Sequence, residues 1–233
     1  MNLGSDRDVA SSPAGEAHTV TGWRAPQGVP TITLLLRHGQ TGMSAQGRFA
    51  GRGDIQLTPA GRQQAAAVAA RLAESGGIDL VVTSPLSRAL DTARAVADAT
   101  GVPLALDDDL VETDFGAWEG LTFGEVLSRW PAELARWQAD VGTAPPAGES
   151  FADVAKRVNG ALDRLLAEHP GQTAVVVSHV TPIKTIICRA LQADSATMFR
   201  MHLDVAALCE VDWFADGPAL LRSLNDTAHL QGR

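Results

Sequence analysis

Two histidines in this chain each follow a short apolar run. His38 comes soon after Thr31–Leu36, and His179 comes directly after Thr173–Ser178. Both runs contain β-branched residues and are too short for a helix, so we expect two buried strands. Ligands of open α/β sheets bind beyond the carboxyl ends of the strands, so the two imidazoles can converge on one crevice. A lone histidine is more often structural, and it is the companions of these two that favour a site.

Two arginines are the first of these companions. Arg37 directly precedes His38 and supplies a guanidinium fork suited to phosphate or carboxylate. Arg88 lies in the tract Ser84–Ala89 (SPLSRA), where a second expected strand gives way to a helix, and a helix N-terminus favours anions. Taken alone, Arg88 would be a solvated helix residue about as often as a ligand. Together, the tracts indicate an anion site.

A third tract combines carboxylates, glycines and aromatic residues. Glu112–Gly120 (ETDFGAWEG) follows the acidic run Asp107–Asp109, and its composition predicts a compact loop at a cleft. Consecutive aspartates can indicate a metal, but an acidic strand edge is the commoner explanation and no histidine lies nearby in the sequence. We therefore expect no metal site.

Composition excludes several other classes of protein. The 233 residues include 19 Lys and Arg against 27 Asp and Glu, a net charge of −8, which argues against binding nucleic acid or anionic lipid through a general field. No apolar run approaches the ~20 residues of a membrane helix, and no signal peptide is visible. The only cysteines, Cys188 and Cys209, exclude a disulfide scaffold and fit a cytoplasmic protein.

Apolar runs separated by capping residues, glycines and prolines predict alternating strands and helices from Thr31 onward. The other expected strands are residues 78–83 and 102–106 and a C-terminal hairpin of 206–214 and 219–224, and the expected helices are residues 59–75, 85–100, 151–168 and 182–191. Such alternation predicts an α/β fold, a three-layer sandwich with a mostly parallel central sheet flanked by helices.

Domain organisation is expected to be simple. Residues 1–29 are rich in Gly, Pro, Ser and Ala without a period, so we expect a disordered tail or linker in which Trp23 is a candidate for local docking. Residues 30–228 are expected to form one domain.

The tracts in this order resemble the histidine phosphatase superfamily, the phosphoglycerate mutase-like group. Its patterns match Arg37–Thr41 (RHGQT), Ser84–Ala89, Glu112–Gly120 and Ser178-His179, and the resemblance covers about residues 31–226. Pro145–Ser150 (PPAGES) and Ser178–Lys184 (SHVTPIK) further resemble the acid-phosphatase half of bacterial bifunctional ribonuclease H/acid phosphatases, and α-ribazole phosphatase is also similar. The sequence leaves open whether such a ribonuclease H domain precedes this chain.

The resemblance implies a role for each matching residue. His38 would be the nucleophile and form phosphohistidine, and Glu112 would protonate the leaving oxygen and then activate water. Partial burial near Phe115 and Trp118 would favour the proton that Glu112 needs in the first step. His179 would add a donor to the developing charge. The implied phosphate-binding residues are Arg37, Arg88, Ser44, Gln40, Thr41 and Val180. Val180 stands where most members have Gly, and Ser44 where Asn is common.

The implied activity is a metal-independent and cofactor-independent phosphomonoester hydrolase of the histidine acid phosphatase type. Its substrate would be a small phosphorylated metabolite, and we expect no membrane or nucleic-acid partner; a homodimer is left open. One alternative is phosphoglycerate mutase-type transfer, although mutases carry Glu-Arg-His-Tyr-Gly where this chain has Glu112–Gly116 (ETDFG) and no tyrosine anywhere. The other alternative is a catalytically inactive phosphate-binding relative.

Overall fold

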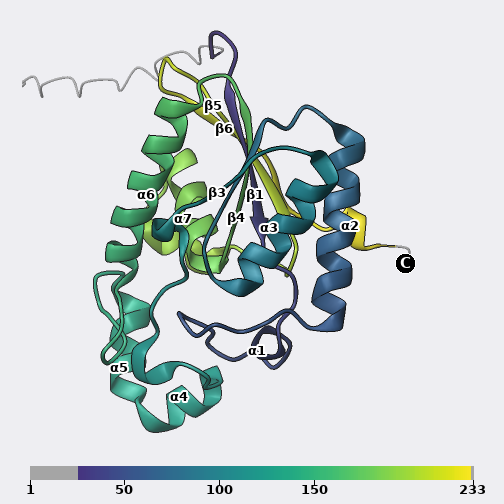
Figure 1. The fold of residues 1–233 in the computed structure, drawn as a ribbon. Coiled ribbons are helices and arrows are strands. Elements are labelled where there is room, and N and C mark those ends of the chain that lie inside the picture. Colours follow the sequence, from purple (N-terminus) through teal and green to yellow (C-terminus); the bar gives the residue numbers. More distant parts are fainter. Residues whose placement is uncertain (1–25, 232–233) are drawn as a thin grey trace, which may run out of the picture.

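The computed structural model describes residues 26–231, and its centre is a six-stranded sheet in the order β3-β2-β4-β1-β5-β6 (Figure 1). The strands are β1 (Thr31–Arg37), β2 (Leu80–Thr83), β3 (Leu104–Leu106), β4 (Thr173–Ser178), β5 (Leu208–Trp213) and β6 (Ala219–Asp226). Strands β3, β2, β4 and β1 run parallel, whereas β5 is antiparallel to β1 and β6 is antiparallel to β5. The expected mostly parallel sheet is confirmed, with a mixed edge.

Helices cover both faces of the sheet. Helices α2 (Pro59–Ser75) and α3 (Ser87–Thr100) lie on one face, and α6 (Phe151–Glu168) and α7 (Val180–Ala190) lie on the other (Figure 1). Successive residues of a strand point to opposite faces, so Leu35 packs in the α6–α7 core and Leu36 in the α2–α3 core. This two-sided burial explains why the central strands are apolar throughout. The three-layer sandwich is confirmed.

Strand register places the candidate tracts together. Arg37, the last residue of β1, pairs with Ser178, the last residue of β4, and Val177 pairs with Thr83, the last residue of β2. The segments that follow these three strands therefore leave the same edge of the sheet. Beyond this edge lie α1 (Gly42–Ala45), α4 (Phe123–Arg129) and α5 (Pro131–Ala139) (Figure 1).

Several boundaries differ from the expectation. Helix α7 begins at Val180, two residues earlier than expected, because Pro182 occupies the first turn, where its missing N–H costs nothing. Helix α3 begins at Ser87, with Leu86 as its N-cap, two residues later than expected. Helices α4 and α5 were not predicted. The capping box of Thr122 and Glu125 is a signal that could have revealed α4.

Most of the expected tail, residues 1–25 with Trp23, lies outside the described residues, so the tail and the 30–228 boundary stay predictions. Among the helices of residues 26–231, none is long and apolar enough to cross a membrane.

Candidate active site

His38 leaves the end of β1 as a buried, neutral imidazole. Its side chain is 4% exposed, and its Nδ1 lies 2.7 Å from the carbonyl oxygen of Gly39. A carbonyl oxygen only accepts, so Nδ1 carries the proton and the unshared pair is on Nε2. Burial lowers the pKa of His38 well below its usual range, and the charges of Arg37 and Arg88 lower it further. The result is a nucleophilic nitrogen that stays unprotonated.

Gly39, the residue after His38, lies so close to another segment of the backbone that only glycine fits there. A Cβ at Gly39 would lie 2.4 Å from the carbonyl oxygen of Gly61, near the start of α2. A residue with a side chain could not fit there without moving the loop. The glycine of the Arg37–Thr41 tract therefore allows the segment after β1, which carries His38, to pack against the start of α2.

His179 leaves the neighbouring strand β4, and its ring centroid lies 5.2 Å from that of His38, at an interplanar angle of 57°. Its Nε2 is 2.8 Å from the hydroxyl of Ser84, which follows β2, while its buried Nδ1 has no partner among the described residues. Burial lowers the pKa of His179 well below its usual range, and Arg88 is the next largest cause. The predicted convergence of the two histidines is confirmed.

Arg88 is a fully buried cation and Arg37 a partly buried one at the same place. Arg88 is fully buried and donates to the carbonyl oxygens of Gly53 at 2.9 Å and Gly51 at 2.7 Å, and Arg37 donates to that of Leu203 at 2.6 Å. Within residues 26–231, neither has a carboxylate within 4.0 Å and neither Nε has an acceptor. A buried charge without a counter-ion is costly, so this pair indicates a site for an anion. Arg88 is not the solvated helix residue of the simpler interpretation.

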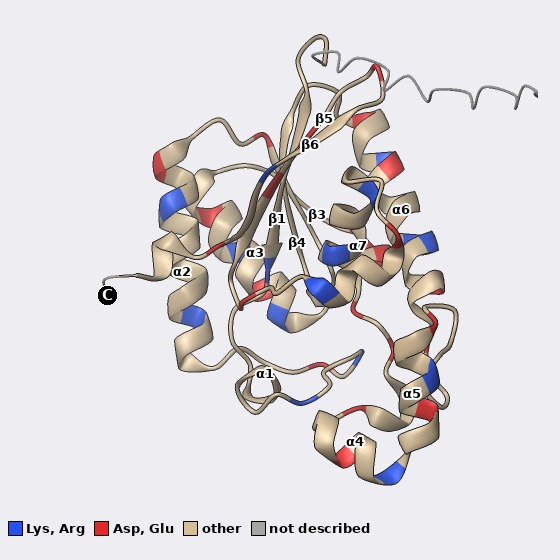
Figure 2. Cartoon of the chain, turned by 180° about the vertical axis from the view of Figure 1, so that it is seen from behind, with Lys and Arg blue, Asp and Glu red and all other residues tan. Residues whose placement is uncertain are grey.

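Figure 2 shows basic residues (blue) near the carboxyl ends of β1 and β4, in a chain with a net charge of −8. The anion site is therefore a local positive focus, which the overall charge does not oppose.

Glu112 faces this region from the loop after β3. The residue is 5% exposed, and its carboxyl group accepts backbone N–H groups of Thr113 at 2.8 Å, Val180 at 3.0 Å and Thr181 at 3.3 Å. The last two donors belong to the first turn of α7, where acceptors are favoured. The backbone N–H of Val180 therefore binds Glu112, and a direct contact of Val180 with phosphate stays a prediction.

A pocket of about 260 Å³ opens onto part of this site. Five of the nine predicted residues line it: Arg37, His38, Ser44, Glu112 and Val180. The other four do not: His179 and Arg88 are fully buried behind it, and Gln40 and Thr41 are engaged elsewhere. The amide of Gln40 accepts from Thr58 Oγ1 at 2.9 Å, and Thr41 caps α1, where its hydroxyl accepts from Ser44 N at 3.1 Å. A direct contact of these two side chains with phosphate stays a prediction.

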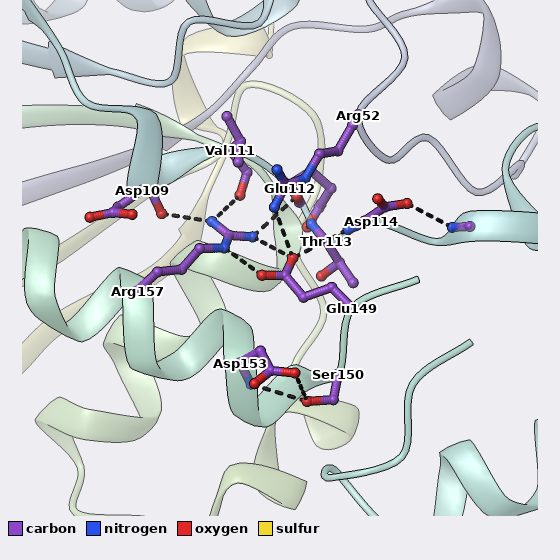
Figure 3. A network of polar contacts seen from close by, with 11 residues as sticks. Arg52, Asp109, Val111, Glu112, Thr113, Asp114, Glu149, Ser150, Asp153 and Arg157 are labelled. Atoms are coloured by element: carbon purple, nitrogen blue, oxygen red, sulfur yellow. Dashed lines mark hydrogen bonds and ion pairs between the residues drawn. The ribbon is translucent and has the colours of Figure 1, made fainter. Parts of the chain in front are cut away.

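Sequence reasoning missed the ion pair that holds the Glu112 loop. Arg157 of α6 binds the carboxylate of Glu149 and also donates to the backbone carbonyl oxygens of Asp109, Val111 and Glu112 (Figure 3). Glu149 in turn accepts from Arg52 at 3.3 Å. The signal available in the sequence was weak: an acidic residue just before a helix and an arginine two turns into it.

Sequence reasoning also missed the other residues that line the pocket, most of which are apolar. The further lining residues are Arg48, Phe49, Ala50, Phe115, Trp137, Phe151, Thr181, Lys184, Met198 and Phe199. They come from segments far apart in the sequence, and no local pattern joins them.

A comparison with models of protein families identifies the family of this chain. Residues 33–227 match the model of the histidine phosphatase superfamily (branch 1). The chain therefore belongs to this superfamily, as the motifs predicted.

Curated relatives give the range of known members. Bifunctional protein Rv2228c of Mycobacterium tuberculosis is 49% identical over 230 residues, which are 99% of this chain and 63% of that protein. This chain thus spans less than two thirds of that relative. Phosphoserine phosphatase 1 of Hydrogenobacter thermophilus is 31% identical over 84% of this chain and 93% of its own length.

Among solved structures, the mycobacterial glucosyl-3-phosphoglycerate phosphatase Rv2419c in complex with VO3 is similar. It has a TM-score of 0.77 and 29% identity, and the alignment covers 84% of this chain and all of that one. Homologues of this chain are therefore phosphatases that act on small phosphorylated metabolites.

Proposed function

We propose that this protein is a metal-independent phosphomonoester hydrolase that works through a phosphohistidine on His38. One observation carries the proposal: a neutral imidazole with its Nδ1 proton held by Gly39 lies beside two arginines, one fully and one partly buried, that have no carboxylate partner among the described residues. A free lone pair next to an uncompensated positive site is what attack on a phosphate monoester needs.

The first step transfers the phosphoryl group. Nε2 of His38 attacks phosphorus, and the bond from phosphorus to the ester oxygen breaks. Arg37 and Arg88 stabilise the charge on the remaining phosphoryl oxygens, and the N–H of His179 adds a donor. Glu112 gives its proton to the leaving oxygen, so that an alcohol departs rather than an alkoxide.

The second step returns the enzyme to its starting state. Glu112, now ionised, takes a proton from a water molecule that attacks the phosphohistidine. The bond from phosphorus to Nε2 breaks, inorganic phosphate leaves, and His38 is again neutral with its proton on Nδ1. The proton count closes, because Glu112 gives one proton and regains one.

Two observations support this proposal without testing its steps. Relatives are named phosphatases, and a similar structure is a complex with the oxyanion VO3. Independence of a metal ion stays a prediction. A cytoplasmic location and the absence of a nucleic-acid partner stay predictions.

The direct test is to trap the intermediate. Protein mixed with a ³²P-labelled phosphomonoester and quenched in alkali should retain label that is stable in base and released by acid, as expected of a phosphoramidate. His38→Ala should abolish the label and nearly all turnover. If the label survives in His38→Ala and is lost in His179→Ala instead, the nucleophile is wrongly assigned; if neither variant affects it, the proposal fails.

A further inference from the structure

One side of the pocket is built of aromatic rings. Trp137 packs against Phe151 with centroids 4.9 Å apart, and Phe199 contacts both of them edge-on, at 5.8 Å from Trp137 and 5.7 Å from Phe151. Phe49 and Phe115 pack on each other at 4.9 Å and line the same pocket. We call these five rings the aromatic wall.

The aromatic wall is assembled from separate elements around one opening. Trp137 comes from α5, Phe151 is the first residue of α6, and Phe199 belongs to the 3₁₀ segment Ser195–Arg200. Four of the five rings are at least partly covered by the protein, but Phe199 is 44% exposed. A ring that is fixed by two others and still open to water at a pocket mouth has apolar surface left to bury against a ligand.

The same pocket carries the proposed chemistry. Arg37, His38 and Glu112 line one cavity with the aromatic wall. When the phosphoryl group of a phosphomonoester is on His38, its alcohol part therefore has the rings within the same cavity as a surface to pack against. The pocket of about 260 Å³ is large enough for this, because a cavity of about 150 Å³ already accepts benzene.

Lys184 offers a different partner to the alcohol part. It lines the pocket, is half-buried, and has no ion-pair partner within 4.0 Å among the described residues. An ammonium group could hold a substrate carboxylate, as a carboxylated phosphate ester would require. Five rings against one flexible ammonium nevertheless give the larger contact surface, and aromatic side chains bury the most area per residue.

We infer, resting on the proposed function, that the substrate is a phosphomonoester of an alcohol carrying an aromatic ring, with this ring packed on Phe199 and Trp137. Phe199 is then a specificity-determining residue, because the ligand ring would cover the surface that it now exposes.

The test compares alcohols that leave equally well. 2-Phenylethyl phosphate and propyl phosphate both release primary alkoxides, so the chemical step is matched and the ring is the main difference. Burying a ring should favour the first ester in kcat/KM by about tenfold or more. O-Phosphoserine, tested in parallel, measures what Lys184 contributes to a carboxylated substrate.

Variants connect the preference to the wall. Phe199→Ala should lower the ratio of the two kcat/KM values about fivefold or more, mainly through KM, and Phe199→Leu should restore part of it. Phe123→Ala is the matched control: Phe123 is also 44% exposed but lies on α4 and does not line the pocket. The control should keep the wild-type ratio.

Each outcome decides the matter. A wild-type ratio near one, a ratio unchanged in Phe199→Ala, or O-phosphoserine as the best of the three esters overturns the inference, while the proposed function stands. If no ester is hydrolysed and no labelled intermediate is trapped, the proposed function fails and the inference fails with it.

Discussion

Arg157 donates two parallel hydrogen bonds to the carboxylate of Glu149, from Nε to Oε1 at 2.8 Å and from Nη2 to Oε2 at 3.0 Å. Burial raises the pKa of the Glu149 carboxyl group, but hydrogen bonds and charge from Arg157, with smaller contributions from Asp114 N–H and Arg52, outweigh it and leave the pKa lowered. Because the same guanidinium binds the carbonyl oxygen of Glu112 at 3.1 Å, the ion pair ties α6 to the loop that carries the proposed acid (Figure 3).

Arg157→Met should therefore affect both stability and catalysis. Removing one partner leaves Glu149, whose side chain is only 15% exposed, with the half-exposed Arg52 at 3.3 Å as its remaining ion-pair partner, and takes the donor from three loop carbonyl oxygens, at a cost of about 3 kcal/mol in the free energy of unfolding. The Glu112 loop should also shift, so kcat for an alkyl ester should fall at least tenfold, and more than for an aryl ester. Urea unfolding and the two-ester ratio measure these effects.

Arg164→Met is the matched control, since Arg164 also lies on α6 and pairs with Asp107 and Asp109, but is 50% exposed. Its removal should cost less than about 1 kcal/mol and leave the ester ratio unchanged. Arg157→Lys should restore only part of the ratio, because an ammonium lacks the planar fork. An ester ratio in Arg157→Met equal to that of the wild type would show that the ion pair is structural only.

Sequence reasoning succeeded where a local rule applied. His38 and His179 were placed together because parallel strands end at one edge, and the register of Arg37 with Ser178 confirms it. Arg88 remained ambiguous in the sequence, since its burial depends on carbonyl oxygens of Gly51 and Gly53, more than 30 residues away. A local pattern cannot show which loop folds over a helix start.

The rest of the site could not be derived for the same reason. The aromatic wall joins residues from Phe49 to Phe199, and Trp137 lies on a helix that the sequence did not predict. A motif can also suggest a contact that the structure does not show. The position of Gln40 in the motif suggested phosphate binding, but its side chain accepts a hydrogen bond from Thr58. Motifs point to the candidate reacting groups, whereas the aromatic wall arises only from tertiary packing.

Glu112→Gln tests the proposed acid. An alkoxide needs a proton to leave, so the variant should lose about 10²-fold or more in kcat for an alkyl phosphate but far less for p-nitrophenyl phosphate. Asp114 and Glu119 are the rival carboxylates, but of these three residues only Glu112 lines the pocket with His38. If Asp114→Asn or Glu119→Gln shows the leaving-group dependence instead, the acid role moves there.

The buried histidines predict how stability depends on pH. In the unfolded chain their pKa is about 6.5, and in the folded protein the pKa of both His38 and His179 is lowered, chiefly by burial. Above pH 6.5 both states are neutral and the full stability is present. As the pH falls below 6.5, only the unfolded chain takes up these protons, so stability is lost toward the folded pKa values.

Each histidine should contribute a slope of up to about 1.4 kcal/mol per pH unit between pH 6 and 5. His179→Gln should remove roughly one such slope and His38→Gln the other, in urea unfolding without phosphate. Unchanged slopes in both variants would show that these imidazoles titrate alike in the folded and unfolded chain. The same lowered pKa keeps the nucleophile free at mildly acidic pH, so activity should persist below pH 6.5.

Chelation should leave activity intact. The proposed chemistry takes its positive charge from Arg37 and Arg88 and a further hydrogen-bond donor from the neutral imidazole of His179, so it needs no ion to neutralise the phosphoryl group. Dialysis against EDTA should change kcat by less than about twofold, because nothing in the proposed steps is removed. Loss of activity on chelation, with recovery on adding Mg²⁺ or Zn²⁺, would contradict the mechanism.

The last prediction separates hydrolysis from isomerisation. A mutase must exclude water and hold a phosphorylated sugar acid while the group returns to a neighbouring hydroxyl. In the mutase-like motif an arginine and a tyrosine stand where this chain has Thr113 and Phe115. Thr113 is fully buried, and Phe115 presents to the pocket a ring without a hydroxyl. Neither can replace a guanidinium fork or a phenol, and discrimination that depends on such polar contacts collapses without them.

Water should therefore accept the phosphoryl group, so a coupled assay with 3-phosphoglycerate should detect free phosphate but no comparable rate of 2-phosphoglycerate formation. Isomerisation faster than phosphate release would overturn the assignment as a hydrolase.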